Sequence, residues 1–245
     1  MNFELYYGKP GKIDYDTIIN MFPKNSINSV RTSSLPLLVY WKDTDKKLKK
    51  ILSFLKLNSS DKYSLCFEYP TSSGAKGKAS MTDLMILSDS KKIAIEAKFT
   101  EVTGKYEVIE NWLQNPNKDN RKNVLENWIQ MIQPFSSSEL KIENIKTIPY
   151  QFLHRTASAC AYYESKEVYV IYQIFYDGET KAELEKFKKE IIKAKEIINP
   201  NEKLKFYLWE LEVKQCIEEA DKEYAFEQIK TKNIYEFLRD EIVEI

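Results

Sequence analysis

Hydrophobic residues near the start of the chain recur at helical spacing. Between Thr44 and Leu57 the leucine and isoleucine residues fall on one face of a helix. Shorter helices are predicted over Tyr15–Phe22 and Ser33–Trp41. We therefore expect residues 1–60 to form a helical N-terminal part.

The hydrophobic pattern then changes from helical spacing to the pattern of strands. Strands are predicted over Tyr63–Tyr69, Asp83–Leu87 and Lys92–Phe99. A polar segment with two glycines, residues 71–80, separates the first two strands, and the turn-rich residues 88–91 suit a hairpin between the second and the third. These three strands predict a meander.

Helices and apolar strands alternate through the rest of the chain. The predicted elements are a helix over 121–133, a helix over 151–163, a strand over 168–176, a helix over 179–198, a strand over 205–213 and a helix near 233–241. This order predicts an α/β fold with a mixed central sheet flanked by helices. We interpret the chain as one domain, with a helical extension at 1–60, an α/β core at 61–215 and a helical C-terminal part at 216–245.

Composition is that of an ordinary globular protein, with 43% hydrophobic and 30% charged residues in a chain of 245. No apolar run approaches the ~20 residues that span a bilayer. The first residues, Met1-Asn-Phe-Glu-Leu5, lack the basic and apolar regions of a signal peptide. We therefore expect a cytoplasmic protein without a membrane partner.

Cysteine and histidine content narrows the chemistry. Cys66, Cys160 and Cys216 are far apart and lie in apolar or helical stretches, which predicts buried free thiols and argues against a zinc site. His154 is the only histidine, which excludes a histidine-rich metal site. The formal net charge is zero, so the overall charge gives no sign of a nucleic-acid partner.

The strand predicted over Lys92–Phe99 carries polar residues on one face. Side chains alternate along a strand, so one face holds Ile93, Ile95, Ala97 and Phe99, and the other holds Ala94, Glu96, Lys98 and Thr100. An acid and a lysine therefore lie side by side at the end of the strand. The hairpin brings Asp83, on the preceding strand, within reach of Glu96 or Lys98.

Two carboxylates and a lysine in this arrangement suit phosphodiester hydrolysis. Mg²⁺ prefers one or two carboxylates together with water and substrate phosphate, and a bound metal lowers the pKa of its water. A lysine can orient the attacking water or stabilise developing negative charge. The alternative is that these residues lie on an exposed strand edge and form a surface ion pair without a functional role.

Asp83, followed after twelve residues by Glu96-Ala97-Lys98, resembles the PD-(D/E)XK motif of restriction-endonuclease-like nucleases. The resemblance covers roughly residues 63–176 and implies an α-β-β-β-α-β core. It implies Asp83 and Glu96 as ligands of Mg²⁺, with Mn²⁺ as a substitute, the Ala97 carbonyl as a candidate third ligand, and Lys98 as the catalytic lysine. The proline of the motif is absent, since Thr82 precedes Asp83.

Two further features belong to this resemblance. Family members often add an acid from the first core helix or strand, and Glu68 is our candidate for that residue. Residues 30–34 and 150–159 are similar to segments of an uncharacterised bacterial subgroup of candidate restriction endonucleases.

Supporting residues come from a helix and a loop. Gln151 and Arg155 share a polar stripe with Ser158 and Tyr162, and this stripe either reaches a phosphate or is a solvated helix face. Lys76 and Lys78 lie in a segment that fails the phosphate-loop template, so we expect a basic loop that touches the nucleic-acid backbone.

These observations predict a Mg²⁺-dependent endonuclease of the restriction or genome-defence type that acts on nucleic acid, with double-stranded DNA the first choice. The alternatives are a non-catalytic binding module with the same fold and a nuclease that acts on RNA or on single-stranded or branched DNA. A homodimer is expected only by analogy with enzymes that cut both strands.

Overall fold

The computed structural model describes residues 1–27, 29–99, 106–114, 118–162, 166–217 and 225–245. Over these residues it contains a mixed sheet of eight strands, in the order β2-β1-β3-β4-β5-β6-β7-β8. The strands are β1 (Phe3–Tyr7), β2 (Lys9–Ile13), β3 (Tyr63–Thr71), β4 (Ser80–Leu87), β5 (Lys91–Lys98), β6 (Glu167–Tyr176), β7 (Leu204–Gln215) and β8 (Tyr235–Glu244).

Strand directions divide the sheet into antiparallel and parallel parts. Strands β3, β4 and β5 form the antiparallel meander that the sequence predicts. Strands β5, β6 and β7 run parallel to one another, and β1 runs parallel to β3. The outer strands β2 and β8 are antiparallel to their neighbours. This arrangement confirms the mixed α/β sheet.

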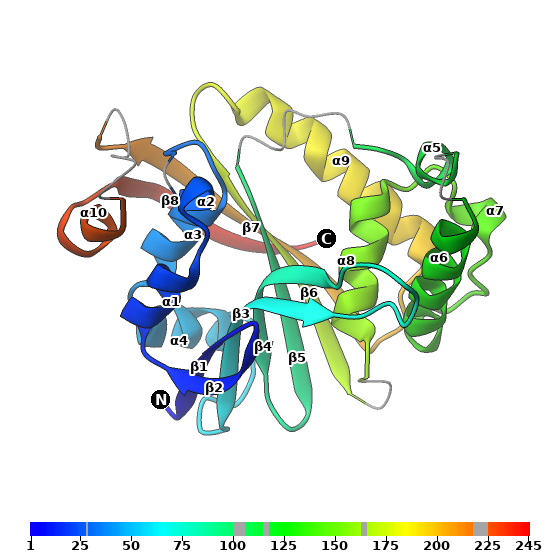
Figure 1. Cartoon of the computed structure of the whole chain (residues 1–245), viewed down its shortest axis with the longest axis horizontal. Helices are drawn as coiled ribbons and strands as arrows, with labels where there is room; N and C mark the ends of the chain where they lie inside the picture. The colour runs from blue at the N-terminus through cyan, green and yellow to red at the C-terminus, as the bar shows by residue number, and fades with distance from the viewer. Residues whose placement is uncertain (28, 100–105, 115–117, 163–165, 218–224) are drawn as a thin grey trace.

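Helices cover both faces of the sheet (Figure 1). One face packs against helices from the two ends of the chain: α1 (Tyr15–Met21), α2 (Lys24–Ile27), α3 (Ser34–Trp41), α4 (Thr44–Phe54) and α10 (Ala225–Thr231). The other face packs against the middle helices: α5 (Ile109–Leu113), α6 (Lys118–Ile132), α7 (Ile142–Ile145), α8 (Tyr150–Cys160), α9 (Lys181–Ile198) and the 3₁₀ turn η2 (Gln133–Phe135).

Alternation along β5 separates the two hydrophobic clusters. Ile93, Ile95 and Ala97 belong to the cluster beneath the terminal helices, and Phe99 joins them just after the strand. Ala94 belongs to the cluster beneath the middle helices. The predicted division of the strand into two faces is therefore confirmed, except for Thr100, which lies outside the described residues.

Both ends of the chain differ from the prediction, because strands were missed there. Residues 1–60 contain the expected helices, but they begin with β1 and β2. The helix expected near 233–241 is wrong, since this segment is β8, an edge strand paired with β7. The sequence of β8 has exposed charged residues like those of a solvated helix, and it forms a strand only because it pairs with the neighbouring strand β7.

Cysteine burial is confirmed for Cys66 and Cys160, but the expectation for Cys216 is wrong because its side chain is exposed. Cys216 follows the last residue of β7, where the chain leaves the core. The helix expected over 151–163 is α8, which begins at Tyr150 and ends at Cys160, and Tyr163 lies outside the described residues. Among the described helices, none has both the length and the apolar character needed to cross a bilayer.

Candidate functional site

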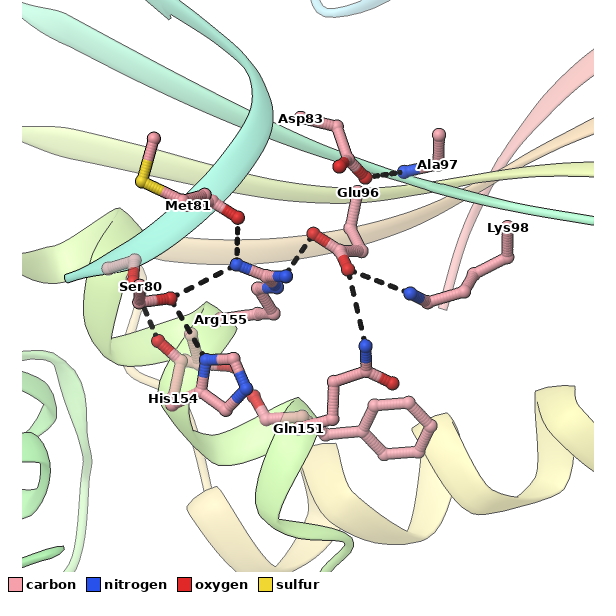
Figure 2. Close-up of polar contacts among 12 residues, drawn as sticks. Ser80, Met81, Asp83, Glu96, Ala97, Lys98, Gln151, His154 and Arg155 are labelled. Atoms are coloured by element: carbon pink, nitrogen blue, oxygen red, sulfur yellow. Dashed lines mark hydrogen bonds and ion pairs between the residues drawn. The ribbon is translucent and has the colours of Figure 1, made fainter. Parts of the chain in front are cut away.

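The candidate site lies where strands β4 and β5 separate. Their ladder runs from Leu87, opposite Lys92, to Leu84, opposite Ile95. Beyond that point β4 continues along β3, while β5 continues along β6 as far as Lys98. The side chain of Asp83 bridges the opening: its Oδ2 accepts a hydrogen bond from the Ala97 backbone N–H at 2.7 Å (Figure 2).

Glu96 is the centre of the polar contacts in this opening (Figure 2). Its Oε1 accepts a hydrogen bond from Lys98 Nζ at 2.8 Å and lies 3.5 Å from Gln151 Nε2. Its Oε2 lies 2.7 Å from Arg155 Nε. Glu96 and Lys98 are only 3% and 5% exposed, so these charges interact with little screening by water.

One oxygen of Glu96 has a charge partner but no hydrogen-bond donor. Among the described atoms, Glu96 Oε2 and Arg155 Nε are buried, and their contact at 2.7 Å is an ion pair that does not meet the geometry of a hydrogen bond. A buried acceptor without a donor is unfavourable. This oxygen therefore has the capacity to accept another ligand.

The two acids of the site have pKa values shifted in opposite directions. Burial alone would raise the pKa of Glu96, but the charges of Arg155 and Lys98 outweigh it and hold this pKa below its ordinary value. Burial, reinforced by the negative charge of Glu96, raises the pKa of Asp83 well above its ordinary value. Carboxylates that repel each other in this way are stabilised by a cation placed near both of them.

Glu68 lies on the third strand of the meander. Phe67 pairs with Leu84 and Tyr69 with Thr82, so the register places Glu68 opposite Asp83. The backbone of Glu68 has φ +50°, in the left-handed region that a non-glycine residue rarely adopts. Burial raises its pKa, and the charges of Arg155 and Glu96 also act on it. The structure thus brings Glu68 close to the same group of charges.

The donor chemistry fits Mg²⁺, although the residues that the structure describes contain no preformed metal cluster. Across the described residues, no three His, Cys, Asp or Glu side chains are already arranged around a common point. Mg²⁺, however, takes only one or two carboxylates and completes its shell with water and phosphate. Asp83, whose pKa is raised, and Glu96, whose Oε2 has an ion-pair partner but no hydrogen-bond donor, supply hard oxygen ligands of that kind.

Helix α8 contributes Gln151 and Arg155, and both lie at the site. The side chain of Arg155 spans two strands, because it pairs with Glu96 on β5 and its Nη1 donates to Ser80 Oγ, at 3.0 Å, and to the Met81 carbonyl on β4. Its contact with a phosphate stays a prediction. The rest of the predicted stripe is wrong: Ser158 is buried, and Tyr162 follows the end of the helix.

His154 and Ser80 were not predicted as part of the site, yet they lie beside it. His154 Nδ1 is 3.0 Å from Ser80 Oγ, and the same oxygen accepts from Arg155. Burial and the charge of Arg155 lower the pKa of His154 to about 3, so the ring is neutral at neutral pH. The sequence contains no local pattern that places Ser80 next to these helix residues, because the contact joins a strand to a distant helix.

Lys76 and Lys78 lie on the loop between β3 and β4, residues 72–79. Both side chains are exposed, and they line a cavity beside α6 and α8. The same cavity is also lined by Ser80 and His154. The role of Lys76 and Lys78 in binding a nucleic-acid backbone stays a prediction.

Comparison with known proteins gives a match to a family model. Residues 13–215 match the model of a family described as Domain of unknown function (DUF6946). No curated protein and no solved structure matches the chain.

Proposed function

Because the chain belongs to this family of unknown function, we propose its activity from its own residues: it is a metal-dependent endonuclease that hydrolyses phosphodiester bonds, with DNA as substrate. The observation that carries this proposal is the position of Asp83, Glu96 and Lys98 together where β4 and β5 separate. The restriction or genome-defence role rests on the resemblance of the motif alone.

The order of elements around the site supports the proposal. Helix α4, strands β3, β4 and β5, helix α8 and strand β6 occur along the chain in the order α-β-β-β-α-β of the restriction-endonuclease-like core, with α5, α6, η2 and α7 inserted between β5 and α8. Helices α4 and α8 belong to hydrophobic clusters on opposite faces of the sheet. The meander thus presents its acids between two helical layers.

In this mechanism Asp83, Glu96 and the Ala97 carbonyl would hold Mg²⁺ or Mn²⁺, which when bound lowers the pKa of a water and offsets negative charge. Lys98 Nζ, 2.8 Å from Glu96, supplies a buried positive charge that orients the attacking water or stabilises charge on the phosphate oxygens. Gln151 and Arg155 donate to the phosphate from α8. Glu68 adds a carboxylate on the other side of Asp83.

A second candidate is a non-catalytic module of the same fold that binds nucleic acid or protein. The observation that favours it is the double ion pair of Glu96, because Lys98 and Arg155 together neutralise this acid as they would neutralise a purely structural one. In that case the protein has no cleavage activity, and replacing Glu96 lowers only the stability of the fold.

Cleavage assays distinguish the two candidates. Plasmid, linear duplex, single-stranded DNA and RNA are incubated with the protein in Mg²⁺, in Mn²⁺ and in EDTA. We expect metal-dependent cleavage that falls by roughly 100-fold or more in Asp83→Asn, which removes a charge that would hold the metal, and in Lys98→Met, which removes the positive charge that acts on the water or the phosphate. Lys186→Met, an exposed lysine on α9, is the matched control.

The outcomes separate cleanly if circular dichroism shows that each variant is folded. Unchanged cleavage in both Asp83→Asn and Lys98→Met contradicts the proposed site. If the folded wild-type protein binds these substrates but cuts none of the four, the result contradicts the proposed enzymatic function and favours the binding module. Light scattering of the protein in solution, with and without duplex DNA, tests the expected homodimer.

A further inference from the structure

A cavity of about 350 Å³ lies beside the candidate site. It is formed between the loop of residues 72–79 and helices α5, α6 and α8, so it belongs to the same side of the sheet as Glu96 and Lys98. Pockets that hold small molecules are of roughly this size. Neither the proposed mechanism nor the PD-(D/E)XK motif uses it.

One wall of the cavity is aromatic and held in place by its own contacts. The rings of Trp112 and Tyr150 stack with centroids 3.9 Å apart and planes 10° apart. Trp128 Nε1 donates to Tyr150 Oη at 3.3 Å, and the ring of His154 lies 4.8 Å from that of Tyr150. These contacts hold the aromatic rings in place before any ligand arrives, and the Arg121 guanidinium lies over the Trp112 ring, 4.8 Å from its centroid.

The cavity also has positively charged residues, which come from the loop of residues 72–79 and from α6. Lys76, Lys78 and Arg121 line the cavity, and none of the described residues that line it is acidic. Asn120 Nδ2 donates to the Lys76 carbonyl at 2.6 Å, which ties the basic loop to α6. In a chain with zero net charge, this local excess of positive charge favours an anionic ligand.

Ser80 and His154 connect the cavity to the candidate site (Figure 2). Both residues line the cavity, and Ser80 Oγ lies 3.0 Å from His154 Nδ1 and 3.0 Å from Arg155 Nη1. Arg155 in turn lies 2.7 Å from Glu96. Two successive contacts, from Ser80 to Arg155 and from Arg155 to Glu96, thus connect the wall of the cavity to the acid of the site.

We propose that this cavity binds the base of one nucleotide, with the basic residues holding an adjacent phosphate, while a neighbouring phosphate of the same strand occupies the site at Glu96. A planar base matches the aromatic wall, and a phosphate matches Lys76, Lys78 and Arg121. A base inside a duplex cannot enter a cavity, so the substrate is single-stranded at this position or has this base flipped out. The inference rests on the proposed nuclease function, whose site supplies the cleaved bond.

Binding without cleavage tests this inference. In EDTA, fluorescence anisotropy compares a labelled single strand, an abasic strand with the same phosphates, and the strand paired with its complement. We expect the wild-type protein to bind the intact strand roughly tenfold or more tightly than the abasic strand, because base–aromatic contacts are lost. Equal affinity for the intact and abasic strands overturns the proposal.

Variants locate the preference within the cavity. Trp112→Leu is expected to abolish the preference for the intact strand, whereas Arg121→Gln and Lys78→Gln weaken binding of both strands. Lys122→Gln, an exposed neighbour of Arg121 on α6, is the matched control and is expected to bind like the wild type. A preference that survives in a folded Trp112→Leu protein contradicts this site.

A second measurement needs no variant, since Trp112 is largely buried and its replacement could disturb folding. A strand with one 2-aminopurine is expected to lose fluorescence when the base contacts the aromatic wall, and no change on saturation contradicts the inference. Base-selective binding in EDTA without any metal-dependent cleavage contradicts the proposed nuclease function but not the proposed base-binding cavity. Cleavage without base preference defeats the cavity proposal alone.

Discussion

At the scale of single residues, the site is defined by two acids in different electrostatic environments. Glu96 has cationic partners on both oxygens, whereas the closest contact of the Asp83 carboxyl is a neutral backbone N–H. This difference explains why the pKa of Glu96 is lowered and that of Asp83 is raised. Asp83 is therefore the acid whose charge is least compensated by the protein.

The first prediction concerns the stability cost of that charge. Replacing Asp83 with Asn keeps the acceptor for the Ala97 N–H and removes the charge, so at neutral pH without metal we expect the free energy of unfolding to rise by roughly 0.5–2 kcal/mol. The pKa of Asp83 is higher in the folded protein than in the unfolded chain. The protonated acid therefore contributes its full stabilisation below the ordinary pKa of aspartate, and this contribution is lost as pH rises through the folded-state pKa.

Urea denaturation across the acidic and neutral range measures this effect. The advantage of Asp83→Asn is expected only at the higher pH values and to vanish below the ordinary pKa of aspartate. Asp89→Asn, on the exposed turn between β4 and β5, is the control and is expected to differ little from the wild type. An advantage for Asp83→Asn that is the same at every pH contradicts the assignment.

At the scale of elements, the site depends on how α8 is held against the sheet. Helix α8 packs on β4, β5 and β6. A fully buried lysine of β5, Lys92, donates to the carbonyls of Ser158 and Ala161, at 2.9 and 3.0 Å, at the C-terminal end of the helix. The same strand that carries Glu96 thus anchors the helix that carries Gln151 and Arg155.

Lys92 leads to a prediction about alkaline pH. Burial lowers the pKa of Lys92 from 10.5 to about 8. The neutral amine therefore contributes its full stabilisation of the folded state above the ordinary pKa of lysine, and this contribution is lost as pH falls through about 8. The wild type should therefore gain roughly 3 kcal/mol of unfolding free energy relative to Lys92→Met as pH rises from about 8 to about 10.5.

The difference between the wild type and Lys92→Met, followed across this interval, cancels the contributions of titrating groups that the two proteins share. Denaturant titrations of wild type, Lys92→Met and the exposed control Lys122→Met provide the measurement. We expect the control to follow the wild type at every pH. A constant difference between the wild type and Lys92→Met would show that the amine does not titrate in this interval.

At the scale of the whole molecule, the candidate site lies inside the sheet and not at its edge. Strands β4 and β5 are the fourth and fifth of eight, and helices cover the sheet on both faces. A cation bound between them contacts two strands of one continuous core, so its binding energy adds to the stability of the entire fold.

Metal binding should therefore be visible as global stabilisation. At a free Mg²⁺ concentration of about 100 times Kd we expect the free energy of unfolding to rise by about 2.7 kcal/mol, which in a chain of this size raises Tm by roughly 5–10 °C. Thermal denaturation with and without Mg²⁺ measures the shift, and Asp83→Asn is expected to lose it. An equal shift in the variant would indicate that Mg²⁺ binds elsewhere.

The parts of this protein that could be predicted from the sequence are those governed by local spacing. The division of β5 into two faces and the meander of β3 to β5 follow from side-chain alternation and turn chemistry, which act between near neighbours. For the same reason the proximity of Asp83 to the Glu96–Lys98 segment could be predicted.

Tertiary structure alone decided the features that join distant segments. Strand β8 became a strand because β7 offered an unpaired edge, although its own residues resemble a solvated helix. Arg155 lies on Glu96, and Ser80 on His154, only because α8 packs over the start of β4. The aromatic and basic cavity likewise combines a loop with three helices. Local propensity carries no information about such contacts, because their energy depends on groups far apart in the chain.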